Sequence, residues 1–92
     1  MYHVKFTKAY KQAYKLMKKR GAKMVLLDEV VERLRRGEKL EPHYRDHALV
    51  GRLQGFRECH IRPDWLLVYM LEEDVLTLTL IETGSHADIF KM

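Results

Sequence analysis

Most of the residues that could carry out acid/base chemistry lie in one stretch of the sequence, residues 43–65. This window contains three of the five histidines, two aspartates and four arginines. Histidine can give or take a proton near neutral pH, because its ordinary pKa lies close to 7. Arginine stays positively charged and binds phosphate oxygens in a bidentate manner. Together these residue types favour general acid/base chemistry on an anionic substrate, and we predict that the window forms most of an RNA-cleaving site.

The candidate catalytic groups are the residues in and near this window that can move or hold a proton: His47, His60, Asp64 and His86. Taken alone, each histidine could be an ordinary surface residue. Asp64 follows a proline, and an aspartate in a turn also has a purely structural explanation. The grouping of all four at the mouth of one loop favours the catalytic interpretation.

The strand predicted at residues 56–62 divides its side chains between two faces, since successive residues of a strand point to opposite sides. Glu58 and His60 are expected on one face, and Arg57 and Cys59 on the other. Cys59 is therefore not expected to act as a nucleophile beside His60. Arg57 and His60 can contact the same phosphate only if a β-bulge turns one of them.

A metal site is an alternative use of the same residues. His43 and His47 lie four positions apart, as do His60 and Asp64. On a helix this spacing suits zinc. However, Pro42 and the loop composition argue against a helix at the first pair, and the strand pattern argues against one at the second. We predict no metal ligands and no cofactor.

The charge of the chain is unevenly distributed. Residues 1–27 contain eight lysines and arginines and no acid, whereas the remainder carries nine basic and thirteen acidic residues, so the two parts have charges of +8 and −4. A basic element of this kind is expected where a protein meets a phosphate backbone. Lys15 and Lys19 are accordingly predicted to contact RNA. The alternative is a lysine-rich helix face that is merely solvated.

Hydrophobic periodicity predicts an α+β fold. The expected elements are a short strand at 2–6, a helix capped by Thr7 and stopped at Gly21, a helix at 23–36, a long ordered loop at 38–55 with at most a short strand, and strands at 56–62, 65–71 and 75–82. The order β-α-α-β-β-β predicts a two-helix hairpin packed on a mainly antiparallel four-stranded sheet. Residues 65–71 are apolar on both faces and should be central.

The size and composition indicate one small globular domain over residues 1–92, because 92 residues leave no room for a second core. The longest apolar run, residues 65–71, is too short to span a membrane. The N-terminus lacks a signal-peptide core. The single cysteine cannot form an internal disulfide, which agrees with a reducing compartment. We therefore expect a cytoplasmic protein.

Three separated blocks of sequence resemble the bacterial YafQ toxins of the RelE superfamily. They are YRDHAL at 44–49, GRLQGFRECHIRPDWLLVY at 51–69 and TGSHADIF at 83–90. The resemblance implies a RelE-like microbial RNase fold. It also implies a type II toxin that cuts messenger RNA in the ribosomal A site, in contact with ribosomal RNA, and that stops translation. A DinJ-type antitoxin that masks the site is implied as its partner.

Carried over by position, the family's functional residues correspond to His47, His60, Asp64, His86, Arg57 and Phe90. Glu58 occupies the position at which the best-known member has an aspartate. This difference keeps the negative charge and lengthens the side chain. Glu58, Arg57 and Phe90 are accordingly predicted to bind the substrate, with Arg57 stabilising the phosphate and Phe90 stacking on a base.

The mechanism expected for such a site is metal-free cleavage by the neighbouring ribose hydroxyl. A base takes the 2′-hydroxyl proton, the oxygen attacks phosphorus, and an acid protonates the departing 5′-oxygen, which leaves a 2′,3′-cyclic phosphate. We expect His86 to be the acid and His47 or His60 to be the base, with Asp64 orienting an imidazole or acting as the base itself.

Two other functions remain open at the level of sequence. The related ParE-like toxins are thought to inhibit DNA gyrase without enzymatic activity, and they lack this set of histidines. A basic RNA-binding module without chemistry is the third possibility. The histidine cluster argues against both, and RNA cleavage by the pure protein would distinguish them.

Overall fold

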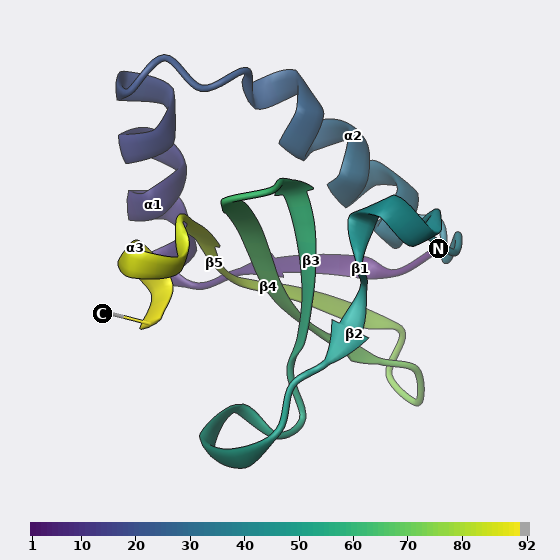
Figure 1. Ribbon diagram of the computed structural model, residues 1–92. Coiled ribbons are helices and arrows are strands. Elements are labelled where there is room, and N and C mark those ends of the chain that lie inside the picture. Colours follow the sequence, from purple (N-terminus) through teal and green to yellow (C-terminus); the bar gives the residue numbers. More distant parts are fainter. Residues whose placement is uncertain (91–92) are drawn as a thin grey trace.

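A single mixed sheet forms the centre of the computed structural model, which describes residues 1–90 (Figure 1). Its strands lie in the order β1-β5-β4-β3-β2. Their bounds are β1 His3–Phe6, β2 His47–Ala48, β3 Arg57–Arg62, β4 Trp65–Glu72 and β5 Thr77–Gly84. β1 pairs with β5 in parallel, and the other neighbours are antiparallel. β4 is the middle strand, as its uninterrupted apolar sequence predicts.

Two helices follow β1 and have the boundaries that their capping residues favour. The side chain of Thr7 accepts a hydrogen bond from the Tyr10 amide and caps α1, which spans Lys8–Lys19. α2 spans Met24–Arg35. Gly21 and Gly37 follow the two C-terminal ends with φ of +84° and +79°, a left-handed conformation that glycine adopts without steric cost. None of the helices within residues 1–90 has both the length and the apolar character needed to cross a membrane.

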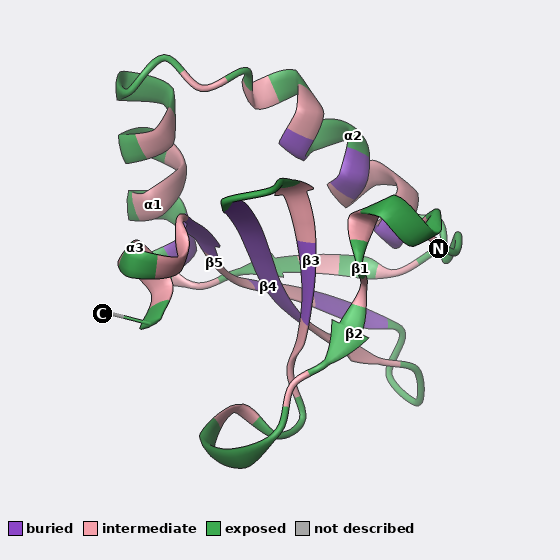
Figure 2. Ribbon diagram, in the orientation of Figure 1, coloured by how far each residue is buried: buried purple, intermediate pink, exposed green. Residues whose placement is uncertain are grey.

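Both helices pack on the same face of the sheet. α1 lies over β5 and α2 over β3, and the two diverge from their short connecting loop (Figure 1). The core lies between helices and sheet, and Figure 2 shows its buried residues on β4 and on the inner sides of the helices. Its buried members are Tyr10, Leu27, Val30, Leu34, Cys59, Trp65, Leu67, Tyr69, Leu78 and Leu80. These two helices do not cover the opposite face of the sheet, although Leu66 and Val68, which point to that face, are also buried, with 0% and 2% exposure.

The fold class predicted from sequence is confirmed, with one strand more than expected. The additional strand is β2, a two-residue element in the middle of the predicted loop. β5 also begins at Thr77, two residues later than predicted, because Leu76 has a φ of +47° and belongs to the preceding turn. The register of β4 and β5 shifts between Val68 and Tyr69, which marks a bulge in their ladder.

The C-terminal segment forms a short helix, α3 (His86–Phe90), which lies beyond the last element predicted from the sequence. A reciprocal pair of hydrogen bonds starts this helix. The Ser85 amide donates to the Asp88 carboxylate at 2.9 Å, and the Asp88 amide donates to Ser85 Oγ at 3.1 Å. This is a capping box with aspartate in the third helical position, and it fixes the direction in which α3 leaves β5.

Gly84, at the end of β5, is required by this cap. Its φ is +146°, and a Cβ built there would lie 2.9 Å from both Cβ and Oδ2 of Asp88. Gly21 also has a positive φ of +84°, but a Cβ there would meet nothing within 4 Å.

We predict that Gly84→Ala destabilises the protein more than Gly21→Ala. Both substitutions incur the backbone cost of a side chain at positive φ, about 1–3 kcal/mol, but only Gly84→Ala also displaces Asp88. Thermal unfolding of the two variants measures the difference. Equal losses of Tm would show that the contact with Asp88 does not constrain the cap.

Candidate active site

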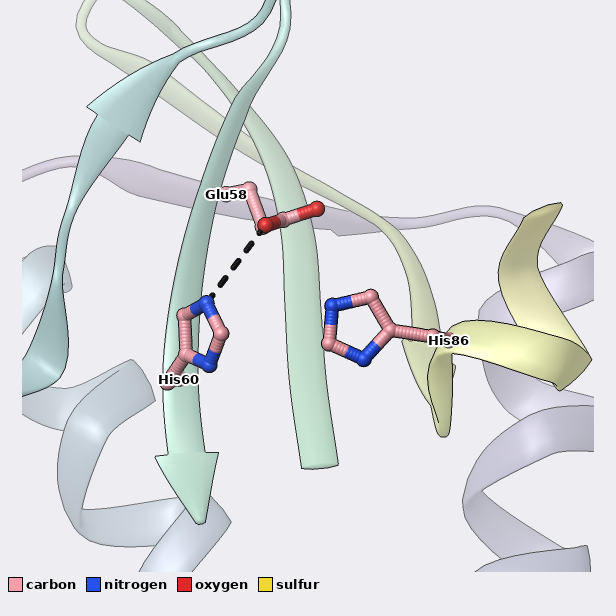
Figure 3. A group of neighbouring side chains, drawn as sticks. All are labelled: Glu58, His60 and His86. Carbon is pink, nitrogen blue, oxygen red and sulfur yellow. Dashed lines mark ion pairs between the residues drawn. The ribbon is translucent and has the colours of Figure 1, made fainter. Parts of the chain in front are cut away.

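Glu58 occupies the centre of a cluster of proton-carrying side chains on the sheet face that α1 and α2 do not cover (Figure 3). Its side chain is only 6% exposed. Its Oε1 lies 3.6 Å from Nε2 of His47 and 3.7 Å from Nε2 of His60. The pairing register explains this arrangement, because His47 lies opposite Glu58 on β2 and His60 follows two residues later on β3.

The rings of His47 and His60 are held in the same way by backbone carbonyls. Nδ1 of His47 lies 2.6 Å from the carbonyl oxygen of Arg45, and Nδ1 of His60 lies 3.2 Å from that of Pro63. A carbonyl can only accept, so the proton of each ring in its neutral form is directed to Nδ1. Nε2 of both histidines is then left facing Glu58, available to take a second proton.

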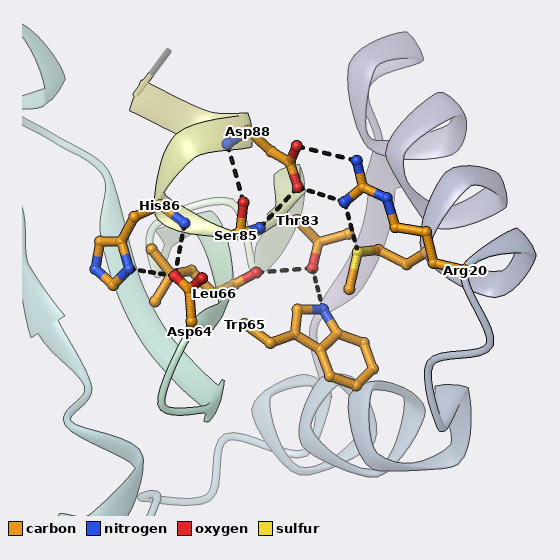
Figure 4. Close-up of polar contacts among 9 residues, drawn as sticks. Arg20, Asp64, Trp65, Leu66, Thr83, Ser85, His86 and Asp88 are labelled. Carbon is orange, nitrogen blue, oxygen red and sulfur yellow. Dashed lines mark hydrogen bonds and ion pairs between the residues drawn. The ribbon is translucent and has the colours of Figure 1, made fainter. Parts of the chain in front are cut away.

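His86 reaches the cluster from α3 and is oriented by Asp64 (Figure 4). Oδ1 of Asp64 accepts from the backbone amide of His86 at 3.0 Å and lies 2.7 Å from Nδ1 of the same residue. Both hydrogen bonds hold the pKa of Asp64 below its ordinary value, and the bond from the backbone amide has the larger effect. Nε2 of His86 therefore points toward Glu58 and His60 (Figure 3), and the rings of the two histidines lie 5.8 Å apart.

Phe90 lies at the edge of the cluster on the last turn of α3. Its ring centre is 6.1 Å from that of His86, and the residue is 37% exposed. An aromatic face at this distance can receive a stacked nucleic-acid base beside the histidines.

α3 is attached to the rest of the protein by an ion pair over a large sequence separation (Figure 4). Nη1 of Arg20, at the end of α1, lies 2.7 Å from Oδ2 of Asp88. This hydrogen bond, together with that from the Ser85 amide, lowers the pKa of Asp88 well below its ordinary value. The position of His86 thus depends on α1 as well as on β5.

Arg57, which the sequence analysis predicted to contact the phosphate, lies apart from the cluster. Arg57 lies opposite Tyr69 on β4, so its side chain is on the helix-covered face. The irregularity of β3 lies beyond His60, between His60 and Arg62, and leaves the alternation from Arg57 to His60 intact. Strand geometry therefore places Arg57 and His60 on opposite faces.

Arg57 instead helps to anchor the segment that carries His47. Its Nη2 lies 3.3 Å from Oδ2 of Asp46, and the hydroxyl of Tyr69 donates to Oδ1 of Asp46 at 2.5 Å. Asp46 directly precedes His47, so these partly buried contacts hold the start of β2 from the helix-covered side. Sequence reasoning missed Asp46 and Tyr69, although a tyrosine in an apolar central strand indicates a hydroxyl that needs a partner.

Lys15 and Lys19 are exposed on α1 and belong to a different part of the surface. Lys15 borders an apolar groove beside Tyr10 and Tyr14, on the helix-covered side of the sheet. Within the described residues, no contact joins either lysine to the histidines. Their predicted role in binding RNA is separate from the cluster.

Three ligand atoms of the cluster lie close enough together to be considered for a metal ion. One atom from each of Glu58, His60 and His86 lies within 4.8 Å of the others. Ligands of a divalent ion such as zinc lie about 2.0–2.2 Å from the metal, so the three side chains fit such an ion after a small movement together. Oε2 of Glu58 is buried and has no hydrogen-bond partner among the described residues, so this oxygen is free to act as a ligand.

The arrangement as a whole brings all four candidate catalytic residues together around one carboxylate. His47 and His60 have an open Nε2 beside Glu58, and His86 has an open Nε2 with Asp64 behind its ring. Such a site can remove one proton and deliver another within a few ångströms, which is the requirement of acid/base catalysis.

Comparison with known proteins identifies clear relatives. A family profile described as "Bacterial toxin of type II toxin-antitoxin system, YafQ" matches residues 2–91. The mRNA interferase toxin YafQ of Escherichia coli (strain K12) is 33% identical over 88 residues, which cover 95% of this chain and 94% of the relative.

Solved structures of similar proteins have the same fold over nearly the whole chain. A metal-bound toxin from Helicobacter pylori is 40% identical with a TM-score of 0.91, over 98% of this chain and 100% of that one. The toxin in an E. coli DinJ-YafQ complex is 30% identical with a TM-score of 0.89, over 98% of this chain and 99% of that one.

We predict that the carboxyl group of Asp64 titrates below the ordinary aspartate value of about 3.9, because its charged form accepts two hydrogen bonds from His86. A pKa lowered by folding contributes stability that is present at neutral pH and is lost as the pH falls through the folded value. Carbon-13 NMR of the carboxyl group measures this pKa directly. In His86→Ala the pKa should move back toward the ordinary value; an Asp64 that titrates identically in both proteins would contradict the pairing.

Proposed function

This chain belongs to the YafQ family of bacterial toxins from type II toxin-antitoxin systems, and we propose that it is an endoribonuclease that cuts messenger RNA in the ribosomal A site and so stops translation. A relative that matches almost the full length of this chain is an mRNA interferase by name. The observation that carries the proposal is the convergence of His47, His60 and His86 around the buried Glu58.

The first step of the proposed reaction is removal of the 2′-hydroxyl proton by His60, with His47 as the other candidate base. The neutral His60 ring has its proton on Nδ1, toward the Pro63 carbonyl, and a free lone pair on Nε2. When Nε2 takes the proton, the imidazolium that forms lies 3.7 Å from Oε1 of Glu58. The carboxylate stabilises this charge more than it stabilises the neutral ring, which favours proton removal.

In the second part of the reaction the 2′-oxygen attacks the adjacent phosphorus and the bond from phosphorus to the 5′-oxygen breaks. His86 gives the proton of its Nε2 to the departing 5′-oxygen, which leaves a 2′,3′-cyclic phosphate and a free 5′-hydroxyl. Asp64 stays hydrogen-bonded to Nδ1 of His86 throughout. It thereby keeps the ring oriented and stabilises its protonated form before transfer.

The remaining predicted residues have supporting roles. Phe90 offers a stacking face for a base beside the scissile bond. Lys15 and Lys19 contact the ribosomal RNA rather than the scissile phosphate, because α1 lies on the other side of the sheet. Both lysines are exposed, so their charges are available to the phosphates of that RNA. Arg57 contributes by holding Asp46 in place, on the opposite face of β3 from His60.

No step of the proposed reaction needs a metal ion, because histidines supply both proton transfers. Glu58, His60 and His86 are the residues that would hold a divalent ion. When bound, such an ion would act as a Lewis acid toward a phosphoryl oxygen. It would also occupy ring nitrogens that the acid/base reaction uses, so activity in the presence of EDTA separates the two cases.

A DinJ-type antitoxin is the proposed protein partner. A related toxin is known in a DinJ-YafQ complex, and this chain matches it over 98% of its length. We propose that the antitoxin of this toxin blocks access to the histidine cluster, of which His47 and His86 have side chains 49% and 41% exposed.

We predict that His60→Ala and His86→Ala each lower the rate of messenger RNA cleavage by about 10²–10⁴-fold, the usual contribution of a general acid or base. Primer extension on a translated message, with and without ribosomes and in EDTA, measures the cuts. The matched control is His3→Ala, which removes an exposed histidine from β1 and should cleave like the native protein. Native-like cleavage by both folded site variants would contradict the assignment. Intact RNA with tight binding to DNA gyrase would instead favour inhibition of gyrase.

A further inference from the structure

Most of the arginines of this protein are neutralised by acids. Five of the eight form salt bridges with carboxylates: Arg20, Arg33, Arg35, Arg36 and Arg57. The other three, Arg45, Arg52 and Arg62, have no carboxylate within salt-bridge distance anywhere in residues 1–90. Unpaired arginines are available for an anionic ligand, so their location is informative.

Two of the three unpaired arginines line one pocket, and His60 forms part of its wall. The pocket has a volume of about 360 Å³ and is lined by His43, Arg45, His60, Ile61, Arg62 and Pro63. No acid is among these residues. By contrast, the pocket that contains Arg57 is also lined by Glu38, Asp46 and Glu73, so its positive charge is largely cancelled.

Local backbone features form this pocket. β2 begins only at His47, opposite Glu58, and runs antiparallel to β3 (Figure 1), so the outer edge of β3 beyond Glu58 has no strand partner. The 3₁₀ turn Pro42–Tyr44 packs against β3 instead. Arg45 then has a φ of +50°, an uncommon conformation for a residue other than glycine, and the register of β3 shifts between His60 and Arg62.

His60 connects this pocket to the proposed catalytic cluster. Its Nδ1 is held by the carbonyl of Pro63, a residue of the pocket, and its Nε2 faces Glu58 in the cluster. A polyanion whose reacting phosphate lies beside Nε2 of His60 would therefore have its next groups within reach of Arg45 and Arg62. A guanidinium binds phosphate through two parallel hydrogen bonds, so the pocket suits a phosphodiester more than a neutral base.

We propose that Arg45 and Arg62 form a binding site for an RNA backbone phosphate that flanks the scissile bond. The proposal rests on the RNA-cleaving function inferred above and adds a subsite to it. The two arginines position the strand so that the reacting ribose stays beside His60, and they contribute to substrate affinity rather than to the transfer of protons.

The kinetic test uses Arg45→Gln, Arg62→Gln and the double variant, with Arg52→Gln as matched control. Glutamine keeps most of the side-chain length and removes only the charge, and Arg52 is the one remaining unpaired arginine, outside the pocket.

We expect each pocket variant to raise KM about tenfold with little change of kcat, because a lost phosphate contact weakens binding uniformly. The logarithm of the binding constant falls linearly with the logarithm of the salt concentration. The slope of this line should become shallower by about one unit for each phosphate contact that is lost. Arg52→Gln should resemble the native protein.

A second measurement keeps this inference separate from the proposed function. A trinucleotide with 2′-deoxy sugars, which cannot react and which carries a second backbone phosphate beside the one at the cleavage position, is titrated into the native protein while the side-chain Nε–H signals of the arginines are followed by NMR. Shifts at Arg45 and Arg62, with Arg52 unaffected, would support the subsite even if no RNA were cut. A native protein that cleaves RNA, together with pocket variants whose KM equals that of Arg52→Gln, would overturn the subsite and leave the function standing.

Discussion

A buried carboxylate that needs compensating charge is the constraint around which this site is arranged. The side chain of Glu58 is 6% exposed, and one of its oxygens has no hydrogen-bond partner among residues 1–90. A buried carboxylate without partners is costly, so groups that can become positive are favoured beside it. His47 and His60 supply that possibility at 3.6 and 3.7 Å. The same contacts place Nε2 of both rings beside a carboxylate, in the middle of the cluster.

The alternation of side chains along β3 separates stability from chemistry within six residues. Arg57 and Cys59 face the helices, where Cys59 is fully buried in the core and Arg57 braces Asp46 with Tyr69. Glu58 and His60 face the other way, into the cluster. β3 can therefore pack against the helices on one side while its opposite side carries the histidine cluster.

Periodicity and capping residues were sufficient to predict the helices, the antiparallel meander and the grouping of the histidines. They could not predict β2 or α3. β2 has two residues, too few for any pattern, and α3 depends on Gly84, on the Ser85–Asp88 cap and on Arg20, which lies 68 positions from Asp88. The alternation rule placed Arg57 correctly, on the face away from His60, whereas the resemblance alone suggested a phosphate contact.

The proposed cleavage depends most directly on attack by the ribose 2′-hydroxyl under the control of this cluster. The decisive measurement is primer extension on ribosome-bound message in which the nucleotide on the 5′ side of the cut carries a 2′-deoxy sugar. The all-ribose message should be cut, and its products should end in a 2′,3′-cyclic phosphate, whereas the substituted message should remain intact at that position. Cleavage of the substituted message at the same position and rate would contradict the account, because the proposed nucleophile would be absent.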